Sequence, residues 1–140
     1  MKKLDIKVIA LDIYGTVLCS DDADGEMPPR KGLKAFFDKC EEKDIKVVSA
    51  SDAGINDVKY DLKSAGVAID RFDKFFKLDH YPVKDFMIIT RDYGITPRNI
   101  LIIGDSYKDI GGATKVGAYY VHVPEYRGTR DDFNLGNIKF

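Results

Sequence analysis

Residues 8–17 read Val-Ile-Ala-Leu-Asp-Ile-Tyr-Gly-Thr-Val, a short apolar run that ends in an aspartate and is followed by a glycine turn. Consecutive apolar positions bury both faces of a strand, and this pattern is typical of strands inside a parallel sheet. The segment therefore predicts a buried first strand at residues 8–11, with the carboxylate of Asp12 at its carboxyl end.

Strand-like and helix-like segments alternate along the rest of the chain. Further strands are predicted at residues 45–49, 100–103 and 119–123, with a short strand inside the ambiguous segment 72–78. Helices are predicted at residues 33–40, 55–65, 84–93 and 110–116. In the first helix, Leu33, Phe36, Phe37 and Cys40 fall on one face. Such alternation implies an α/β fold in which helices cover both faces of a parallel sheet. The polar residues 124–140 are expected to wrap the surface.

The composition limits the classes of protein that need to be considered. The 140 residues carry 22 Lys and Arg against 23 Asp and Glu, a formal net charge of −1. This length predicts one domain, and the balanced charge gives no reason to expect a nucleic acid or a membrane as partner. Two cysteines, Cys19 and Cys40, make neither a disulfide framework nor a zinc cluster. Since the sequence also has no long apolar stretch or leader-like pattern, we expect a cytoplasmic protein.

Polar side chains gather where the predicted strands end. Asp12 follows the first strand, Ser51 the second and Asp105 the fourth. The carboxyl ends of parallel strands share one edge of the sheet, where such folds bind ligands, so we expect these side chains to meet there. Asp109 follows Asp105 by about one helical turn. Lys84, at the start of a predicted helix, can project a cation to the same point.

This set of groups suits a phosphate and Mg²⁺. Mg²⁺ prefers oxygen ligands and commonly takes one or two carboxylates together with phosphate oxygens. An aspartate can attack phosphorus and form an aspartyl phosphate, while a lysine and a metal stabilise the transferring group. Taken singly, each of these residues is more often a turn or helix-capping residue. Their joint order at successive strand ends favours a functional site.

Residues 12–17 (Asp-Ile-Tyr-Gly-Thr-Val) resemble the first motif of the haloacid dehalogenase-like (HAD) superfamily. Ser51 resembles the second motif, Lys84 the third, and residues 104–109 (Gly-Asp-Ser-Tyr-Lys-Asp) the fourth. The motifs occur in the same order and at strand ends, and the resemblance covers about residues 7–123. It implies a three-layer, Rossmann-like, doubly wound parallel sheet and the activity of a Mg²⁺-dependent phosphohydrolase.

The resemblance also implies roles for individual residues. Asp12 is the expected nucleophile, and Ser51 and Lys84 are expected to hold the phosphoryl group, with Lys77 as the alternative lysine. The expected Mg²⁺ ligands are Asp12, the backbone carbonyl of Tyr14, Asp105 and Asp109. The residues expected to face the substrate are Tyr14, Gly15, Thr16 and Asp52.

One position departs from the pattern of the phosphatases in this superfamily. Most of them have a second aspartate two residues after the nucleophile, which protonates the leaving group and later activates water, whereas this sequence has Tyr14. A phenol, with an ordinary pKa of about 10, is a poor base at pH 7. The pattern Asp-x-Tyr-Gly-Thr is similar to the haloacid dehalogenases of the superfamily, which carry a helical cap. Residues 18–29 are too few for that cap, so we expect a capless chain.

Several functions therefore remain open at this point. The first hypothesis is a Mg²⁺-dependent phosphatase for a phosphorylated small molecule or macromolecule. The alternatives are a weakened domain that binds a phosphate or a partner, and a dehalogenase. A signalling receiver domain ranks last, because its phosphoacceptor normally ends the third strand. An open site also gives a reason to expect a homo-oligomer. The acidic residues 21–26 are expected to form a loop over the site, and His80 to be a loop residue.

Overall fold

Five parallel strands form the centre of the molecule. The computed structural model describes residues 4–20, 27–79, 82–128 and 130–140, so the predictions for residues 1–3, residues 21–26 and His80 lie outside the described residues. The strands are paired in the order β3-β2-β1-β4-β5. Their bounds are β1 (Val8–Leu11), β2 (Lys46–Ser51), β3 (Lys74–Lys77), β4 (Ile100–Gly104) and β5 (Tyr119–His122).

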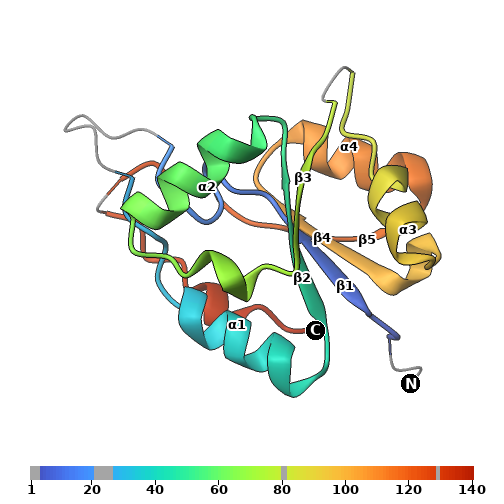
Figure 1. Cartoon of the computed structure of the whole chain (residues 1–140), viewed down its shortest axis with the longest axis horizontal. Coiled ribbons are helices and arrows are strands. Elements are labelled where there is room, and N and C mark those ends of the chain that lie inside the picture. The colour runs from blue at the N-terminus through green and yellow to red at the C-terminus, as the bar shows by residue number, and fades with distance from the viewer. Residues whose placement is uncertain (1–3, 21–26, 80–81, 129) are drawn as a thin grey trace.

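Helices cover both faces of this sheet, which confirms the predicted α/β architecture. In Figure 1, α1 and α2 lie on one side of the sheet, and α3 and α4 lie on the other. The helices are α1 (Leu33–Glu42), α2 (Ile55–Ser64), α3 (Met87–Tyr93) and α4 (Tyr107–Val116), with short 3₁₀ turns η1 (Ile69–Arg71), η2 (Pro97–Asn99) and η3 (Leu135–Asn137). Among the described residues, no helix has the length and apolar character needed to span a membrane.

The alternating side chains of the central strands divide the core into two layers. Ile9 and Leu11 of β1 point into a cluster with α1, α2 and η3. Val8 and Ala10 point the other way, into a cluster with the region of α3 and α4. All four residues are almost fully buried, which explains why this strand is continuously apolar in the sequence. Helix α1 buries the predicted stripe, which consists of Leu33, Phe36, Phe37 and Cys40.

The start of the third helix differs from the prediction. We expected a helix from about Lys84, but α3 begins at Met87. The backbone N–H of Lys84 donates to the carbonyl of Lys108, which holds this residue in the loop against α4. The carboxylate of Asp85 accepts from the N–H of Met87 at 3.1 Å and so satisfies a donor at the start of the helix.

The C-terminal segment also differs from the prediction of a polar surface tail. Tyr126, Leu135 and Ile138 are buried, and Leu135 and Ile138 belong to the same core layer as α1. The N–H of Leu135 donates to the carbonyl of Lys31, just before α1. Apolar side chains spaced irregularly through a polar stretch gave no helical or strand period, so their burial was not visible in the sequence.

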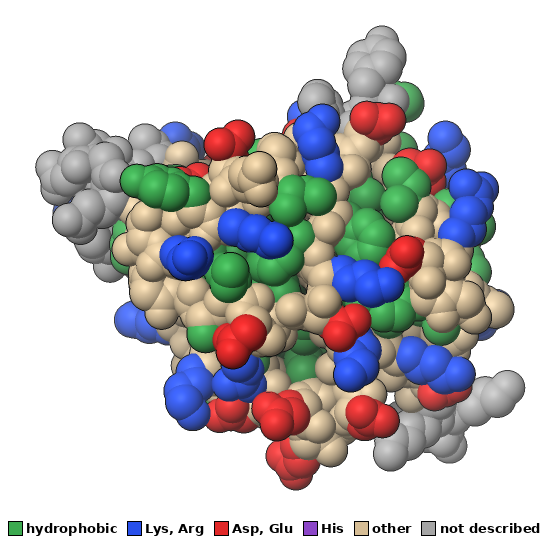
Figure 2. Space-filling model, in the orientation of Figure 1, with side chains coloured by type: hydrophobic (Ala, Val, Ile, Leu, Met, Phe, Trp, Pro, Cys, Tyr) green, Lys and Arg blue, Asp and Glu red, His purple; other side chains and the backbone are tan. Residues whose placement is uncertain are grey.

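The exposed face of the molecule carries charges of both signs. In Figure 2, basic and acidic side chains are interspersed over the visible face, with apolar side chains between them. Exposed ion pairs include Lys34 with Asp38 on α1 and Lys74 with Asp92. Exposed pairs of this kind contribute little to stability.

Candidate active site

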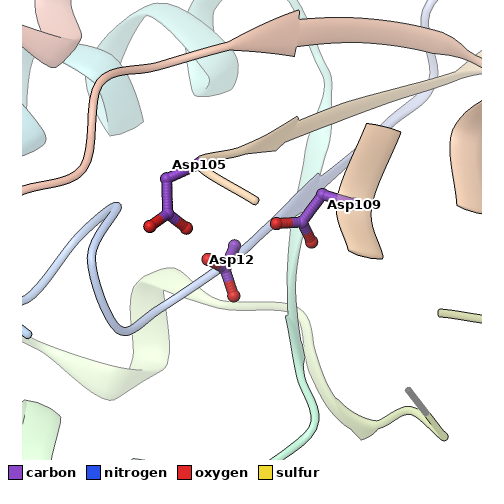
Figure 3. Close-up of side chains that lie close together, drawn as sticks. All are labelled: Asp12, Asp105 and Asp109. Atoms are coloured by element: carbon purple, nitrogen blue, oxygen red, sulfur yellow. The ribbon is translucent and has the colours of Figure 1, made fainter. Parts of the chain in front are cut away.

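Three carboxylates meet at the carboxyl edge of the sheet. Asp12 follows β1 and Asp105 follows β4, and the pairing of Leu11 with Ile103 in the preceding register brings the two strand ends side by side. Asp109 comes from the first turn of α4. One oxygen of each carboxylate lies within 4.8 Å of the others, and Figure 3 shows the three side chains around a common point.

Two glycines leave room for these carboxylates. A Cβ atom on Gly15, whose φ is +85°, would lie 2.5 Å from a carboxylate oxygen of Asp105. A Cβ atom on Gly104 would lie 2.4 Å from the carboxylate of Asp109. Real side chains do not approach this closely, so any larger residue at either position would displace a carboxylate. The glycines of the first and fourth motifs therefore shape the acidic cluster.

Lys84 supplies the positive charge among these groups. Its Nζ lies 2.9 Å from Asp12 Oδ1, 2.7 Å from Asp109 Oδ1 and 2.8 Å from the carbonyl oxygen of Ala50. The Lys84 side chain is only 3% exposed. Lys77, the alternative considered from the sequence, lies exposed at the end of β3. The structure thus places Lys84 beside Asp12, although this lysine precedes α3 and does not begin it.

Burial and mutual repulsion disfavour the charged forms of Asp12 and Asp109. Burial raises the pKa of Asp12 to about 7, with Asp105 adding to the rise and Lys84 opposing it. Burial and the charge of Asp12 likewise raise the pKa of Asp109. Burial alone would lower the pKa of Lys84, but Asp12 and Asp109 outweigh it and raise that pKa above its ordinary value. Lys84 therefore contacts Asp12 and Asp109, two of the three carboxylates, and its single positive charge is smaller than their summed formal charge.

A divalent cation fits this donor set. Carboxylate oxygens are the ligands that Mg²⁺ prefers, and buried charges in proteins are normally paired or bound to a metal. Asp12, Asp105 and Asp109 could hold such an ion, and the missing side chains of Gly15 and Gly104 leave room for the carboxylates of Asp105 and Asp109. The backbone carbonyl of Tyr14, the further ligand implied by the resemblance, stays a prediction.

Thr16 of the first motif contacts Asp12, and Ser51 of the second motif ends the neighbouring strand β2. The hydroxyl of Thr16 lies 3.1 Å from Asp12 Oδ2 and 3.3 Å from Asp105 Oδ1. Its single proton can donate to one of these two carboxylates at a time. Ser51 is the last residue of β2 and is buried, and its Oγ accepts from the N–H of Ala53 at 3.1 Å. This hydrogen bond is the local turn contact expected of a serine that has only a structural role. A hydroxyl that accepts in one direction can donate in another.

Two further residues combine a structural contact with their place at the edge of the site. Asp109 accepts hydrogen bonds from the N–H and the hydroxyl of Ser106 at the start of α4. It therefore caps this helix in addition to contacting Lys84. Asp52 forms a loose ion pair with Lys108, with 3.7 Å between the nitrogen and the oxygen. Asp109 therefore lies in the acidic cluster, as predicted, while the substrate-facing role of Asp52 stays a prediction.

Tyr14 is engaged by a residue that the sequence did not single out. Its hydroxyl donates to the carboxylate of Asp61 on α2 at 2.5 Å. Burial and this carboxylate raise the pKa of the Tyr14 phenol well above its ordinary value. The phenol is therefore even less suited to exchange a proton at neutral pH than an exposed tyrosine. Asp61 belongs to the polar side of an amphipathic helix, and nothing in that pattern separates it from a solvated residue.

Comparisons with known proteins give a partial family match and a shared fold. A family model described as HAD-hydrolase-like matches residues 82–136, which contain Lys84, Asp105 and Asp109. The fold is similar to a haloacid dehalogenase-like family hydrolase from Streptococcus pneumoniae, with a TM-score of 0.71, 12% identity, and coverage of 88% of this chain and 87% of that chain. The matched segment of this chain, from the residues before α3 to η3, is thus similar to that family, and the solved structure shares the fold of the whole domain. A search of curated proteins found no match.

Other solved structures with a similar fold have different described activities. One is described as a predicted phosphoglycolate phosphatase from Haemophilus somnus, with a TM-score of 0.67, 14% identity, and coverage of 88% of each chain. Another is an L-2-haloacid dehalogenase from Xanthobacter autotrophicus, with a TM-score of 0.67, 14% identity, and coverage of 84% of this chain and 77% of that chain. At such identities the likeness shows the shared fold, so the choice between these chemistries rests on the site itself.

Proposed function

We propose that this chain is a member of the HAD superfamily and a Mg²⁺-dependent phosphohydrolase that forms an aspartyl phosphate on Asp12. The observation that carries the proposal is the position of Asp12, with Lys84 against one carboxylate oxygen and Thr16 against the other. Asp105 and Asp109 complete an acidic cluster whose charge one lysine does not balance. A dehalogenase that attacks carbon needs no cation in this place, so the cluster favours phosphoryl transfer.

The chain's own groups can carry out the first step. An oxygen of Asp12 attacks phosphorus, the new bond to phosphorus forms, and the bond to the leaving oxygen breaks with its electron pair on that oxygen. Lys84 and the hydroxyl of Ser51 would hold the phosphoryl oxygens, while Asp109 keeps the ammonium of Lys84 in place through their contact of 2.7 Å. Bound Mg²⁺ would stabilise the negative charge of the transferring group.

The second step, in which water releases phosphate from Asp12, lacks an obvious base. Tyr14 occupies the position of the usual second aspartate, and its hydroxyl is hydrogen-bonded to Asp61. We therefore propose a slow hydrolysis of the phosphoenzyme. The same observation supports the second candidate, a domain that binds phosphate or a partner with little turnover. It is also compatible with a dehalogenase. Release of chloride from 2-chloropropionate would establish that activity.

The substrate we propose is a phosphorylated small molecule or macromolecule. Nucleic acid and membrane partners remain unexpected on the balanced charge of the chain, and we propose a cytoplasmic location. Within the described residues, all helices and strands belong to the sheet and its covering layers, so no cap lies over the acidic cluster there. A second copy of the chain would be one way to cover such an open site.

Metal dependence is the direct test of this function. We expect the purified chain to release phosphate from p-nitrophenyl phosphate in the presence of Mg²⁺, and excess EDTA to reduce the rate by at least about 100-fold, since the metal stabilises the transferring charge. Adding back Mg²⁺ should restore the rate. If the Mg²⁺-loaded chain releases no phosphate from a broad panel of phosphoesters, the catalytic form of the proposal is wrong.

Restoring the missing acid is expected to speed turnover. Tyr14→Asp should raise the rate of phosphate release by about 10- to 100-fold, since general acid–base catalysis typically contributes this much or more. Asp61 would place a second negative charge near the new carboxylate, so the double variant Tyr14→Asp/Asp61→Asn should show the larger gain. The measurement is steady-state phosphate release, with Asp61→Asn alone as the control. Vigorous turnover by the wild type with no gain in either variant would show that another group already supplies the base.

A further inference from the structure

A buried arginine lies between the acidic cluster and the segment that follows β5. Arg30 precedes α1 and is 2% exposed. Its Nε and Nη2 donate to the two carboxylate oxygens of Asp131 at 3.1 and 2.7 Å, and Nη2 also donates to the carbonyl of Pro124 at 2.6 Å. The guanidinium lies over the rings of Tyr126 and Phe133, with 5.3 and 4.7 Å between its central carbon and the ring centres. A two-point pair of this kind fixes orientation as well as charge.

The same arginine contacts the loop that carries the first motif. Its Nη1 donates to the backbone carbonyl of Thr16 at 3.4 Å. On the other side of this residue, the Thr16 hydroxyl contacts the carboxylates of Asp12 and Asp105. Thr16 is therefore held at its carbonyl by Arg30 and at its side chain by the acidic cluster, and it is fully buried.

A second contact connects the segment after β5 with this loop. The N–H of Tyr126 donates to the carbonyl of Gly15 at 2.7 Å. Gly15 is the residue whose lack of a side chain leaves room for Asp105. Arg30 holds this segment by Pro124 on one side of Tyr126 and by Asp131 on the other. The backbone of Gly15 and Thr16 is thus fastened to a part of the chain more than 100 residues away in sequence.

We propose that Arg30 is a positioning residue for the acidic cluster. It sets the distance between Asp12 and Asp105 by holding Thr16 and the segment after β5 in a fixed arrangement. The buried pair with Asp131 removes the freedom of the guanidinium to follow any movement of the loop. The inference rests on the proposed function, because it assigns Arg30 an effect on the metal site that the three carboxylates would form.

The test measures Mg²⁺ binding by calorimetry on the full chain, which needs no turnover. Arg30→Lys keeps the charge but loses the two-point pair with Asp131. We expect it to weaken the affinity for Mg²⁺ about tenfold, the size of effect found when partners of metal ligands are changed. Asp131→Asn, in which the side chain keeps nearly the same shape, should also weaken the affinity for Mg²⁺. This variant provides the test if Arg30→Lys does not fold. The Mg²⁺ concentration that gives half of the maximal phosphatase rate should rise in parallel.

A matched control separates positioning from general stabilisation. Lys39 on α1 also fastens the C-terminal segment, by donating to the carbonyl of Ile138 and lying over the ring of Phe140. Lys39→Met should lower the melting temperature but leave Mg²⁺ affinity unchanged. Equal Mg²⁺ affinity in wild type and Arg30→Lys would overturn the role of Arg30 and leave the proposed function standing. A wild-type chain that binds no Mg²⁺ would overturn the proposed metal site, and the inference with it.

Discussion

Asp12→Asn is expected to reduce Mg²⁺-dependent phosphate release by at least about 10⁴-fold, the scale of loss seen when a catalytic nucleophile is removed. The amide has nearly the same shape as the carboxylate, but it cannot attack phosphorus and form the covalent intermediate. The variant should also fail to retain phosphate after acid quenching of a reaction with labelled substrate. Both measurements use the same phosphoester that the wild type hydrolyses best.

The loss should not result from unfolding. Burial already disfavours the charge of Asp12, and Lys84 keeps its contact with Asp109 in this variant, so we expect only a small change in the metal-free stability. Urea unfolding of both proteins in EDTA checks this point. Asp70→Asn is the matched control, because Asp70 is an exposed aspartate in η1 and is expected to change neither rate nor stability appreciably. If Asp12→Asn released phosphate at the rate of the wild type, Asp12 would be excluded as the nucleophile.

Lys84→Met is expected to damage both stability and activity. The change leaves the buried carboxylates of Asp12 and Asp109 without their shared cation, and breaking a buried pair in this way typically costs about 3–5 kcal/mol. Loss of a charge that stabilises the transferring group should also lower the rate by about 10²- to 10³-fold. We expect Mg²⁺ to recover part of the free energy of unfolding, since it would offset the same carboxylates, but not the rate.

Lys77→Met decides between the two lysines that the sequence left open. Lys77 is exposed on β3, so its loss should change the free energy of unfolding by less than about 0.5 kcal/mol. Urea unfolding with and without Mg²⁺, together with phosphate release at saturating Mg²⁺, gives the comparison. If Lys77→Met abolished activity while Lys84→Met retained it, the assignment of the phosphate-binding lysine would be reversed.

Much of the fold and the placement of the acidic cluster could be predicted because both depend on local patterns. A continuously apolar strand such as β1 reports burial on both faces, and a stripe such as Leu33, Phe36 and Phe37 reports the buried side of a helix. In a parallel sheet the residue after each strand must lie at one edge. Asp12 and Asp105 were therefore expected to be neighbours before their distance was known.

The sequence by itself thus determined the strands, the helices and the edge at which the acidic motifs meet. Only the tertiary structure decided that Lys84 rather than Lys77 contacts Asp12, that Asp61 holds Tyr14, and that Arg30 reaches both Thr16 and Asp131. It also placed Leu135 and Ile138 in the core. These contacts join residues far apart in the chain through side-chain reach and loop path. The periodicity of a sequence cannot predict the reach of a side chain or the path of a loop, because it reports only which face of a helix or strand is buried.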